Sequence, residues 1–209
     1  EESVRRTFKE YGMPQTVLCD NGDPWGTSQS AGYTQFEVWL MELGILTIHI
    51  RPWHPQTQGK TERFNRSFKD ERLKFYVPYD LTDANRQCAE YRDFYNNERP
   101  HHALNLDVPV QHYKPSKRAF TGEIADWEYG QEYELRKIKG TGFITYDGQG
   151  YFFSEAFKGK TIATKPSSKD GFVNLYYRQF RVGRINLKER TIVSRKCYRI
   201  KDDPFETNL

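Results

Sequence analysis

The sequence predicts an α/β domain followed by a small all-β domain, and three observations carry this prediction. In the first half, short apolar runs of strand composition alternate with amphipathic helical segments. In the second half, short runs rich in Tyr, Phe, Val, Ile and Thr are separated by glycine-containing turns. Between the two, the chain turns irregular and contains Pro109, Pro115 and Lys117-Arg118, which is typical of a domain boundary.

The first elements follow from residue spacing. Residues 3–12 place apolar and charged residues at helical spacing and end at a glycine, which predicts a helix. Residues 16–19 form an apolar run of strand composition that ends in the turn sequence of residues 20–22. Apolar residues then recur at helical spacing over 36–43, and the β-branched run over 45–50 predicts a second strand.

Two further helices are expected in the first half. Residues 60–75 contain no Gly or Pro and carry an apolar face, and residues 81–96 have a similar pattern. Strands that alternate with helices imply a parallel arrangement, whose active groups lie at the carboxyl ends of the strands. Asp20 and the loop that leads to Glu62 would both lie there.

The second half reads as a small barrel or sandwich. The pairs Asp147-Gly148 and Asp170-Gly171 are tight-turn signals between strands. The predicted organisation is a core domain over 1–116, a linker over 117–131, a basic all-β segment over 132–201, which we call the β-domain, and an acidic tail over 202–209.

Charge is distributed unevenly along the chain, although the net charge is only +4. Residues 1–131 hold 16 Lys and Arg against 19 Asp and Glu, whereas residues 132–201 hold 16 against 6, a local net charge of +10. A segment of this charge favours a polyanion such as nucleic acid as its partner. A solvated surface of mixed charge is the alternative interpretation.

Membrane segments are not predicted. No run approaches the roughly 18 consecutive apolar residues of a membrane helix, and the first ten residues contain no apolar signal segment. We therefore expect a cytoplasmic protein, associated with the nucleoid and not with a membrane.

Two carboxylates are candidates for chemistry. Asp20 follows a strand, so its side chain would project into a cleft, but Asp-Asn-Gly is also ordinary turn sequence. Glu62 lies in the first turn of its helix, with Arg66 and Lys69 on the same side. The alternative is a glutamate that complements the helix dipole and pairs with Arg66.

The two segments together resemble a known family. Asp20-Asn21-Gly22 after a strand, a Trp- and Leu-rich helix that ends at Gly44, and the element HPQTQGKTER over 54–63 are similar to the integrase core of DDE transposases and retroviral-type integrases. The resemblance is closest to the IS481 and IS3 type groups of bacterial insertion sequences. It covers residues 1 to 115, and more loosely the β-domain.

The resemblance implies a ribonuclease-H-like fold and a set of three metal-binding carboxylates, of which Asp20 and Glu62 are two. The first aspartate of the family lies upstream on the first core strand, and this sequence has no Asp before Asp20. We therefore expect a partial core that lacks its first strands, binds metal weakly and catalyses poorly. The separation of Asp20 and Glu62 exceeds the usual family spacing, which we attribute to a longer loop before Tyr33.

The resemblance also implies the chemistry and the partners. Two divalent metals, Mg²⁺ with Mn²⁺ able to substitute, would support cleavage of element ends and their joining to target DNA by in-line phosphoryl transfer. Double-stranded DNA and a homo-oligomer are the expected partners. The expected DNA-binding residues are Gln56, Gln58, Lys60, Arg66 and Lys69 near the active site and Lys158, Lys160, Arg178, Arg181 and Arg184 in the β-domain.

Other functions stay open at this point. A ribonuclease-H-like nuclease would use similar carboxylates without needing a separate basic β-domain. A truncated, inactive product that binds DNA ends or dimerises with the intact protein would act as a regulator instead.

Overall fold

The computed structural model describes residues 1–22, 25, 32–50, 59–193 and 196–203. The chain divides into two compact units, of which the first joins residues 1–50 with residues 116–209 and the second is residues 51–115. Segments far apart in the sequence therefore build the first unit, which contains the predicted β-domain. The predicted domain boundaries at residues 116 and 131 stay a prediction.

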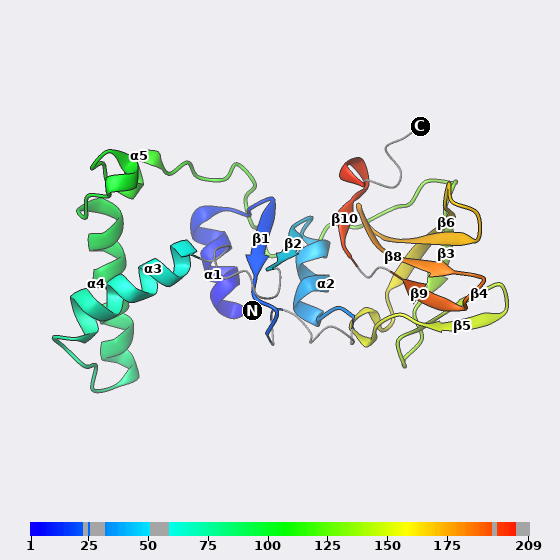
Figure 1. Ribbon diagram of the computed structural model, residues 1–209, viewed down its shortest axis with the longest axis horizontal. Coiled ribbons are helices and arrows are strands. Elements are labelled where there is room, and N and C mark those ends of the chain that lie inside the picture. The colour runs from blue at the N-terminus through cyan, green and yellow to red at the C-terminus, as the bar shows by residue number, and fades with distance from the viewer. Residues whose placement is uncertain (23–24, 26–31, 51–58, 194–195, 204–209) are drawn as a thin grey trace. The chain divides into compact units, whose positions relative to one another are not determined.

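The first unit begins with the elements α1, β1, α2 and β2, an α-β-α-β order as predicted. Helix α1 (Glu2–Tyr11) ends at Gly12, whose φ of 76° is a conformation that favours glycine. Strand β1 (Thr16–Cys19) pairs in parallel with β2 (Leu46–His49), and α2 (Gln35–Glu42) connects them (Figure 1). The parallel pairing aligns Cys19 with His49, so both strands end at the same edge.

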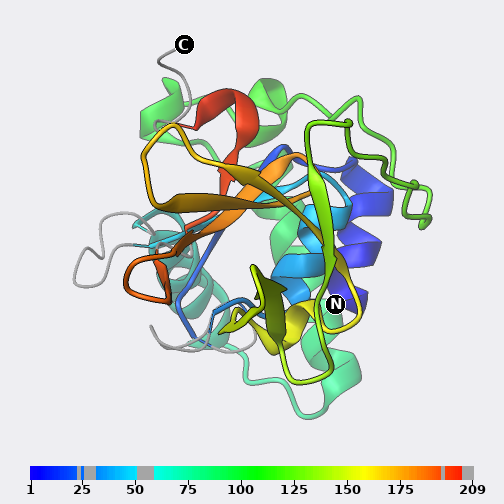
Figure 2. The ribbon, with the colours of Figure 1, turned by 90° about the vertical axis from the view of Figure 1, so that its right-hand side faces the viewer.

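The β-domain is antiparallel. A six-stranded sheet has the order β10-β8-β7-β6-β3, with β9 paired to β8, and β4 and β5 form a separate hairpin. Its members are β3 (Glu134–Lys137), β4 (Phe143–Tyr146), β5 (Gln149–Phe152), β6 (Thr161–Pro166), β7 (Phe172–Tyr177), β8 (Phe180–Asn186), β9 (Thr191–Val193) and β10 (Tyr198–Arg199). In Figure 2 the yellow and orange strands of this sheet cross in front of the viewer.

Both predicted turns of the β-domain are confirmed. Asp147 and Gly148 both have positive φ, 47° and 71°, and connect β4 to β5 by a tight turn. Gly171 has a φ of 77° immediately before β7. Short 3₁₀ helices at Glu155–Phe157 and Ile200–Asp202 complete the β-domain.

Helix α2 lies between two hydrophobic clusters of the first unit. Phe36, Trp39 and Leu40 pack with Phe8 of α1 and with Phe120. The opposite side of the helix, which contains Val38 and Met41, packs into the core of the β-domain. Because the helix is apolar on both sides, it is buried nearly all round.

The second unit is helical. It contains α3 (Gly59–Phe68), a π-helical turn at Lys69–Leu73, α4 (Leu81–Asn97), a 3₁₀ turn at His102–Leu104 and α5 (Pro109–His112). Aromatic rings connect α3 to α4, with Phe64 in edge contact with Tyr95 at 4.9 Å and Phe68 in contact with Tyr91 at 5.0 Å. The two predicted helices are confirmed, and within the described residues no helix has the length and apolar character that crossing a membrane requires.

Candidate functional site

Asp20 lies at the carboxyl end of β1 and its side chain is exposed. Its Oδ1 accepts the Asn21 backbone N–H at 2.6 Å, and the Asn21 side chain donates to the Ile50 carbonyl at 2.8 Å. The Asn21 side chain therefore connects the end of β1 to the end of β2. The carboxylate stays at the surface of that strand edge.

A buried acid and a histidine support the backbone at this edge. Glu37 is only 4% exposed; its Oε2 accepts the Thr34 backbone N–H at 2.7 Å in a capping box, and its Oε1 lies 2.8 Å from His49 Nε2. The other ring nitrogen of His49 lies 3.3 Å from the Asp20 carbonyl oxygen. The Glu37-His49 pair thus connects the first turn of α2 to the residue that carries the candidate carboxylate.

Both groups that face the His49 ring accept hydrogen bonds, so the ring satisfies both contacts only when both nitrogens carry a proton. The hydrogen bond to Glu37 accordingly raises the pKa of His49 above 6.5. Burial, and then the charge of Glu37, raise the pKa of the neighbouring Cys19 thiol to about 11, so this thiol stays protonated at neutral pH.

Sequence reasoning missed this pair. The Thr34-x-x-Glu37 capping box was readable from the sequence, but it indicates only a helix start. That the second oxygen of Glu37 meets His49 depends on the parallel register of β1 and β2, which no local pattern encodes.

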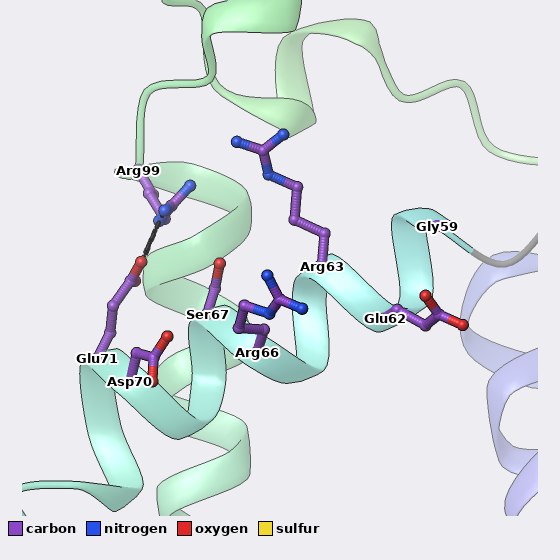
Figure 3. Close-up of a pocket in the computed structure, with 8 residues that line it drawn as sticks. All are labelled: Gly59, Glu62, Arg63, Arg66, Ser67, Asp70, Glu71 and Arg99. Carbon is purple, nitrogen blue, oxygen red and sulfur yellow. Dashed lines mark hydrogen bonds and ion pairs between the residues drawn. The ribbon is translucent and has the colours of Figure 1, made fainter. Parts of the chain in front are cut away.

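Glu62 lies in the first turn of α3, in the second compact unit, and is exposed. It lines an open cleft of about 520 Å³ whose other residues are Gly59, Arg63, Arg66, Ser67, Asp70, Glu71 and Arg99 (Figure 3). In Figure 3 the Glu62 carboxylate points away from Arg63 and Arg66. No ion pair joins Glu62 to Arg66 within the described part of the chain, so the predicted alternative of a simple helix-surface pair is not formed.

Cations of the cleft differ in whether they have partners. Arg99 donates to Glu71 at 2.6 Å, and Tyr91 donates its hydroxyl to the same carboxylate at 3.0 Å. These contacts, that of Arg99 first, lower the pKa of Glu71. Arg66 of the cleft, and Lys69, which follows α3 and does not line the cleft, are exposed and form no ion pair among the described residues, so both can reach an external anion.

The remaining predicted site residues fall into four groups, the last of which is buried. Gln56 and Gln58 lie outside the described residues. Lys60, at the start of α3, and Lys158 in the β-domain are exposed. Lys160 and Arg178 are both bound to Glu42 of α2, since Lys160 Nζ lies 2.5 Å from its carboxylate and Arg178 donates to its carbonyl oxygen at 3.0 Å.

Two predicted DNA-binding arginines are buried in the β-domain. Arg181 is fully buried and forms an ion pair with Asp203, which is also fully buried, with Nη2 donating to Oδ1 at 2.9 Å. Arg184 is 8% exposed and donates Nε to the Asn174 side chain at 3.0 Å. Their guanidinium groups hold the sheet together, so we leave both out of the DNA-binding surface proposed below.

The described residues contain no group of three or more His, Cys, Asp or Glu side chains that could hold a metal ion. Asp20 belongs to the first compact unit and Glu62 to the second. Their oxygen ligands are of the type that Mg²⁺ prefers, and both are exposed, which leaves room for water and phosphate oxygens.

Known proteins match both halves of the chain. An integrase core domain matches residues 43–109, and the C-terminal domain of IS481 family transposases matches residues 133–193. An uncharacterized 39.2 kDa protein of insertion element IS476 from Xanthomonas euvesicatoria is 35% identical over 100 residues, which are 48% of this chain and 27% of that protein.

Two further relatives agree. A putative transposase for insertion sequence element IS5376 from Geobacillus stearothermophilus is 23% identical over 199 residues, 91% of this chain and 48% of that protein. An uncharacterized 31.7 kDa protein of insertion element IS407 from Burkholderia multivorans is 33% identical over 109 residues, 52% of this chain and 37% of that protein. The chain spans less than half the length of these three relatives. With an integrase core match followed by an IS481-type domain match, the chain is similar in both halves to insertion-element transposases of the IS481/IS3 type.

Proposed function

We propose that this chain supplies Asp20 and Glu62 as metal-binding carboxylates to a transposase that cleaves the ends of its element and joins them to target DNA. The observation that supports the proposal most directly is the position of Asp20. It is exposed at the carboxyl end of a parallel strand, where α/β folds bind their ligands, and its backbone is tied to β2 and to the Glu37-His49 pair.

The chemistry follows from the donor set. Asp20 and Glu62 would be ligands of Mg²⁺ or Mn²⁺, and the metal would activate water or a DNA 3′-hydroxyl and stabilise the charge of the in-line displacement. Asp20 and Glu62 contribute negatively charged oxygens from a strand end and a helix start. Arg66 and Lys69, which have no ion-pair partner in the described residues, hold DNA phosphates near the reacting atoms.

Supporting residues keep this site in place. The Glu37-His49 pair holds the Asp20 backbone, and the turn hydrogen bond of Asn21 does the same from the side of β2. In this proposal Gln56, Gln58 and Lys60 contact DNA. Element-end DNA and target DNA are the proposed partners, in an assembly of several copies of the protein.

Substitution of Glu62 tests the proposal. Glu62→Gln keeps the size of the side chain and removes its charge. In the complete polypeptide that the element encodes, this substitution should abolish DNA joining and leave DNA binding unchanged. Joining is measured with donor-end DNA and Mg²⁺ or Mn²⁺. Glu98→Gln, an exposed glutamate at the end of α4, is the matched control and should join at the wild-type rate. Retained joining by Glu62→Gln would refute the assignment.

Whether the two carboxylates share an ion is a separate question with its own measurement. Mn²⁺ affinity is compared for wild type, Asp20→Asn, Glu62→Gln and the double variant. If both residues ligate the same ion, the second substitution weakens binding less in the background of the first than in wild type, because coupled residues give non-additive effects. Strictly additive losses would place the two carboxylates at independent sites.

A regulatory role is the second candidate. In this role the polypeptide occupies element ends without joining them. Binding to element ends with no joining under either metal would favour it. The match of residues 133–193 to a transposase domain gives no support to a stand-alone ribonuclease-H-like nuclease.

A further inference from the structure

Three arginines of the first unit converge on the backbone that flanks the β-α-β arrangement. Arg118 donates Nη1 to the Pro14 carbonyl at 2.7 Å and Nη2 to the Leu43 carbonyl at 2.5 Å. Arg199, in β10, donates to the carbonyl of Gln15, the residue after Pro14. Arg178 donates to the Glu42 carbonyl at 3.0 Å. The contacts of Arg118 and Arg199 on adjacent residues place their two charges close together.

Two of these arginines have a structural role that explains them. Leu43 is the C-cap of α2, and the last carbonyls of a helix lack partners within the helix and carry a partial negative charge. Arg118 and Arg178 therefore satisfy the end of α2. Arg199 is not explained in this way, because its acceptor belongs to the segment before β1.

The positive charge at this place is not balanced. Burial lowers the pKa of Arg118, and the neighbouring charge of Arg199 lowers it further. Across the described ranges of the chain, none of Arg118, Arg199 and Lys201 forms an ion pair with a carboxylate. Asp202, next to Lys201, is exposed and forms no ion pair with these cations in that part of the chain.

A cleft of about 400 Å³ opens beside these charges and is lined by Gln179, Arg199, Ile200 and Lys201. Gln179 Nε2 and Arg118 Nη2 both lie close to Gly44. A side-chain carbon on Gly44 would lie 2.7 Å from Gln179 Nε2 and 3.2 Å from Arg118 Nη2. The Arg199 guanidinium lies over the Phe180 ring, 5.6 Å from its centroid, which restricts its position. We call these four lining residues the Arg199 cleft.

We infer that the Arg199 cleft binds a backbone phosphate of DNA. A guanidinium, an ammonium and an amide N–H group supply the charged and neutral donors that a phosphate accepts from. Ile200 and Lys201 leave the cleft open to the surface, as a phosphate of a continuous strand requires and a sequestered small anion does not. The inference rests on the proposed function for the identity of the nucleic acid, and it adds a contact surface that none of the predicted DNA-binding residues includes.

A salt series with this chain tests the cleft. Binding to a labelled DNA duplex is followed by fluorescence anisotropy between 50 and 200 mM salt for wild type, Arg199→Gln and Lys201→Gln. Loss of one phosphate contact lowers the slope of log Kd against log salt concentration by about 0.9. The factor by which Kd increases between 50 and 200 mM salt should therefore be about 3.5-fold smaller for each variant than for wild type. The loss should be the same for element-end and random sequences.

The matched control is Lys188→Gln. Lys188 lies in a turn of the same domain with its side chain 76% exposed, and its ion pair with Asp170 is long, at 3.5 Å. Its salt slope should equal that of wild type. Because Arg199 also bonds the Gln15 carbonyl, urea unfolding is measured for every variant, and Lys201→Gln, whose side chain is exposed, keeps the test independent of that bond.

The outcomes separate the two proposals. Reduced slopes for Arg199→Gln and Lys201→Gln support the cleft. Unchanged slopes overturn the inference that the cleft binds a DNA phosphate. They leave the proposed transposase function intact, because that function is tested by DNA joining and by Glu62→Gln. Tight binding of inorganic phosphate by wild type but not by Arg199→Gln, with unchanged DNA slopes, would assign the cleft to a free anion and overturn the inference. Absence of any DNA binding by a folded chain would count against both.

Discussion

Several basic residues of the β-domain are used in the opposite way from Arg66 of α3 and Lys69 of the π-helical turn that follows it. Arg66 and Lys69 lie on the surface of the second unit without ion-pair partners in the described residues. In the β-domain, by contrast, Arg181 is fully buried against Asp203, and Lys160 is bound to Glu42 of α2. The net charge of +10 over residues 132–201 therefore overstates the charge that this segment presents to solvent.

The charge counted from a sequence equals the surface charge in some elements and not in others. An exposed helix such as α3 turns its charged residues outward, so its sequence charge approximates its surface charge. A strand in the middle of a sheet does not, and β8 is buried along its whole length. Charge in a strand can pair internally, and only the tertiary structure shows which case holds.

The largest expected effect concerns the buried pair. Arg181→Ala leaves Asp203 as an unpaired buried carboxylate, so the free energy of unfolding should fall by about 3–5 kcal/mol. Urea unfolding measures this loss. The double variant Arg181→Met with Asp203→Leu removes both charges and should be markedly more stable than Arg181→Ala. A loss below about 1 kcal/mol for Arg181→Ala would show that this arginine is available to solvent.

Glu42 provides the second test. Its carboxylate accepts the Tyr177 hydroxyl at 2.7 Å as well as Lys160, and its side chain is 9% exposed. Burial and this bond raise the pKa of Tyr177 far above its usual 10, which keeps the hydroxyl protonated as a donor. Glu42→Ala should lower the free energy of unfolding by about 1–3 kcal/mol. Glu2→Ala, at the exposed start of α1, is the control and should change it by less than about 0.5 kcal/mol.

The helix residues should show the reverse behaviour. Arg66→Gln and Lys69→Gln should change the free energy of unfolding by less than about 0.5 kcal/mol, while each lowers the salt slope of DNA binding by about 0.9. Arg92→Gln, an exposed arginine of α4, is the matched control. If the slopes of Arg66→Gln and Lys69→Gln equal that of wild type, the contrast between α3 and the β-domain does not concern DNA.

The smallest effect is the pH dependence of the Arg99-Glu71 pair. The folded pKa of Glu71 is lowered from 4.5, so the pair stabilises the fold above that pH, and this contribution is lost as the pH falls through the lower, folded pKa. Both side chains are about one-third exposed, so solvent screens the pair and its worth is about 1 kcal/mol or less. Wild type should lose more stability than Glu71→Gln between pH 7 and pH 3.5. Equal losses of unfolding free energy in wild type and in Glu71→Gln would contradict a stabilising role of the Arg99-Glu71 pair.

Much of the secondary structure was predictable because it depends on neighbours in sequence. Thr16–Cys19 carries strand composition between turn residues, and the Asp147-Gly148 pair fixes the β4-β5 turn through its positive φ angles. The position of Asp20 at a strand end followed from the same local pattern.

What the sequence could not show depends on distant partners. Val38 and Met41 read as ordinary helix residues, yet they are buried against the β-domain, more than 90 positions further along the chain. The Glu37-His49 contact and the burial of Arg181 arise in the same way, from strand register and sheet order. Local periodicity contains none of this information.

Helix α2 has a mechanical consequence. The helix contributes to the hydrophobic cluster of Phe8 and Phe120 on one side and to the β-domain core on the other. Unfolding of either cluster therefore removes packing contacts from the other. The first unit should therefore lose its structure in one cooperative transition. The Glu37-His49 pair also connects α2, whose Val38 and Met41 pack into the β-domain core, to the strand end that carries Asp20.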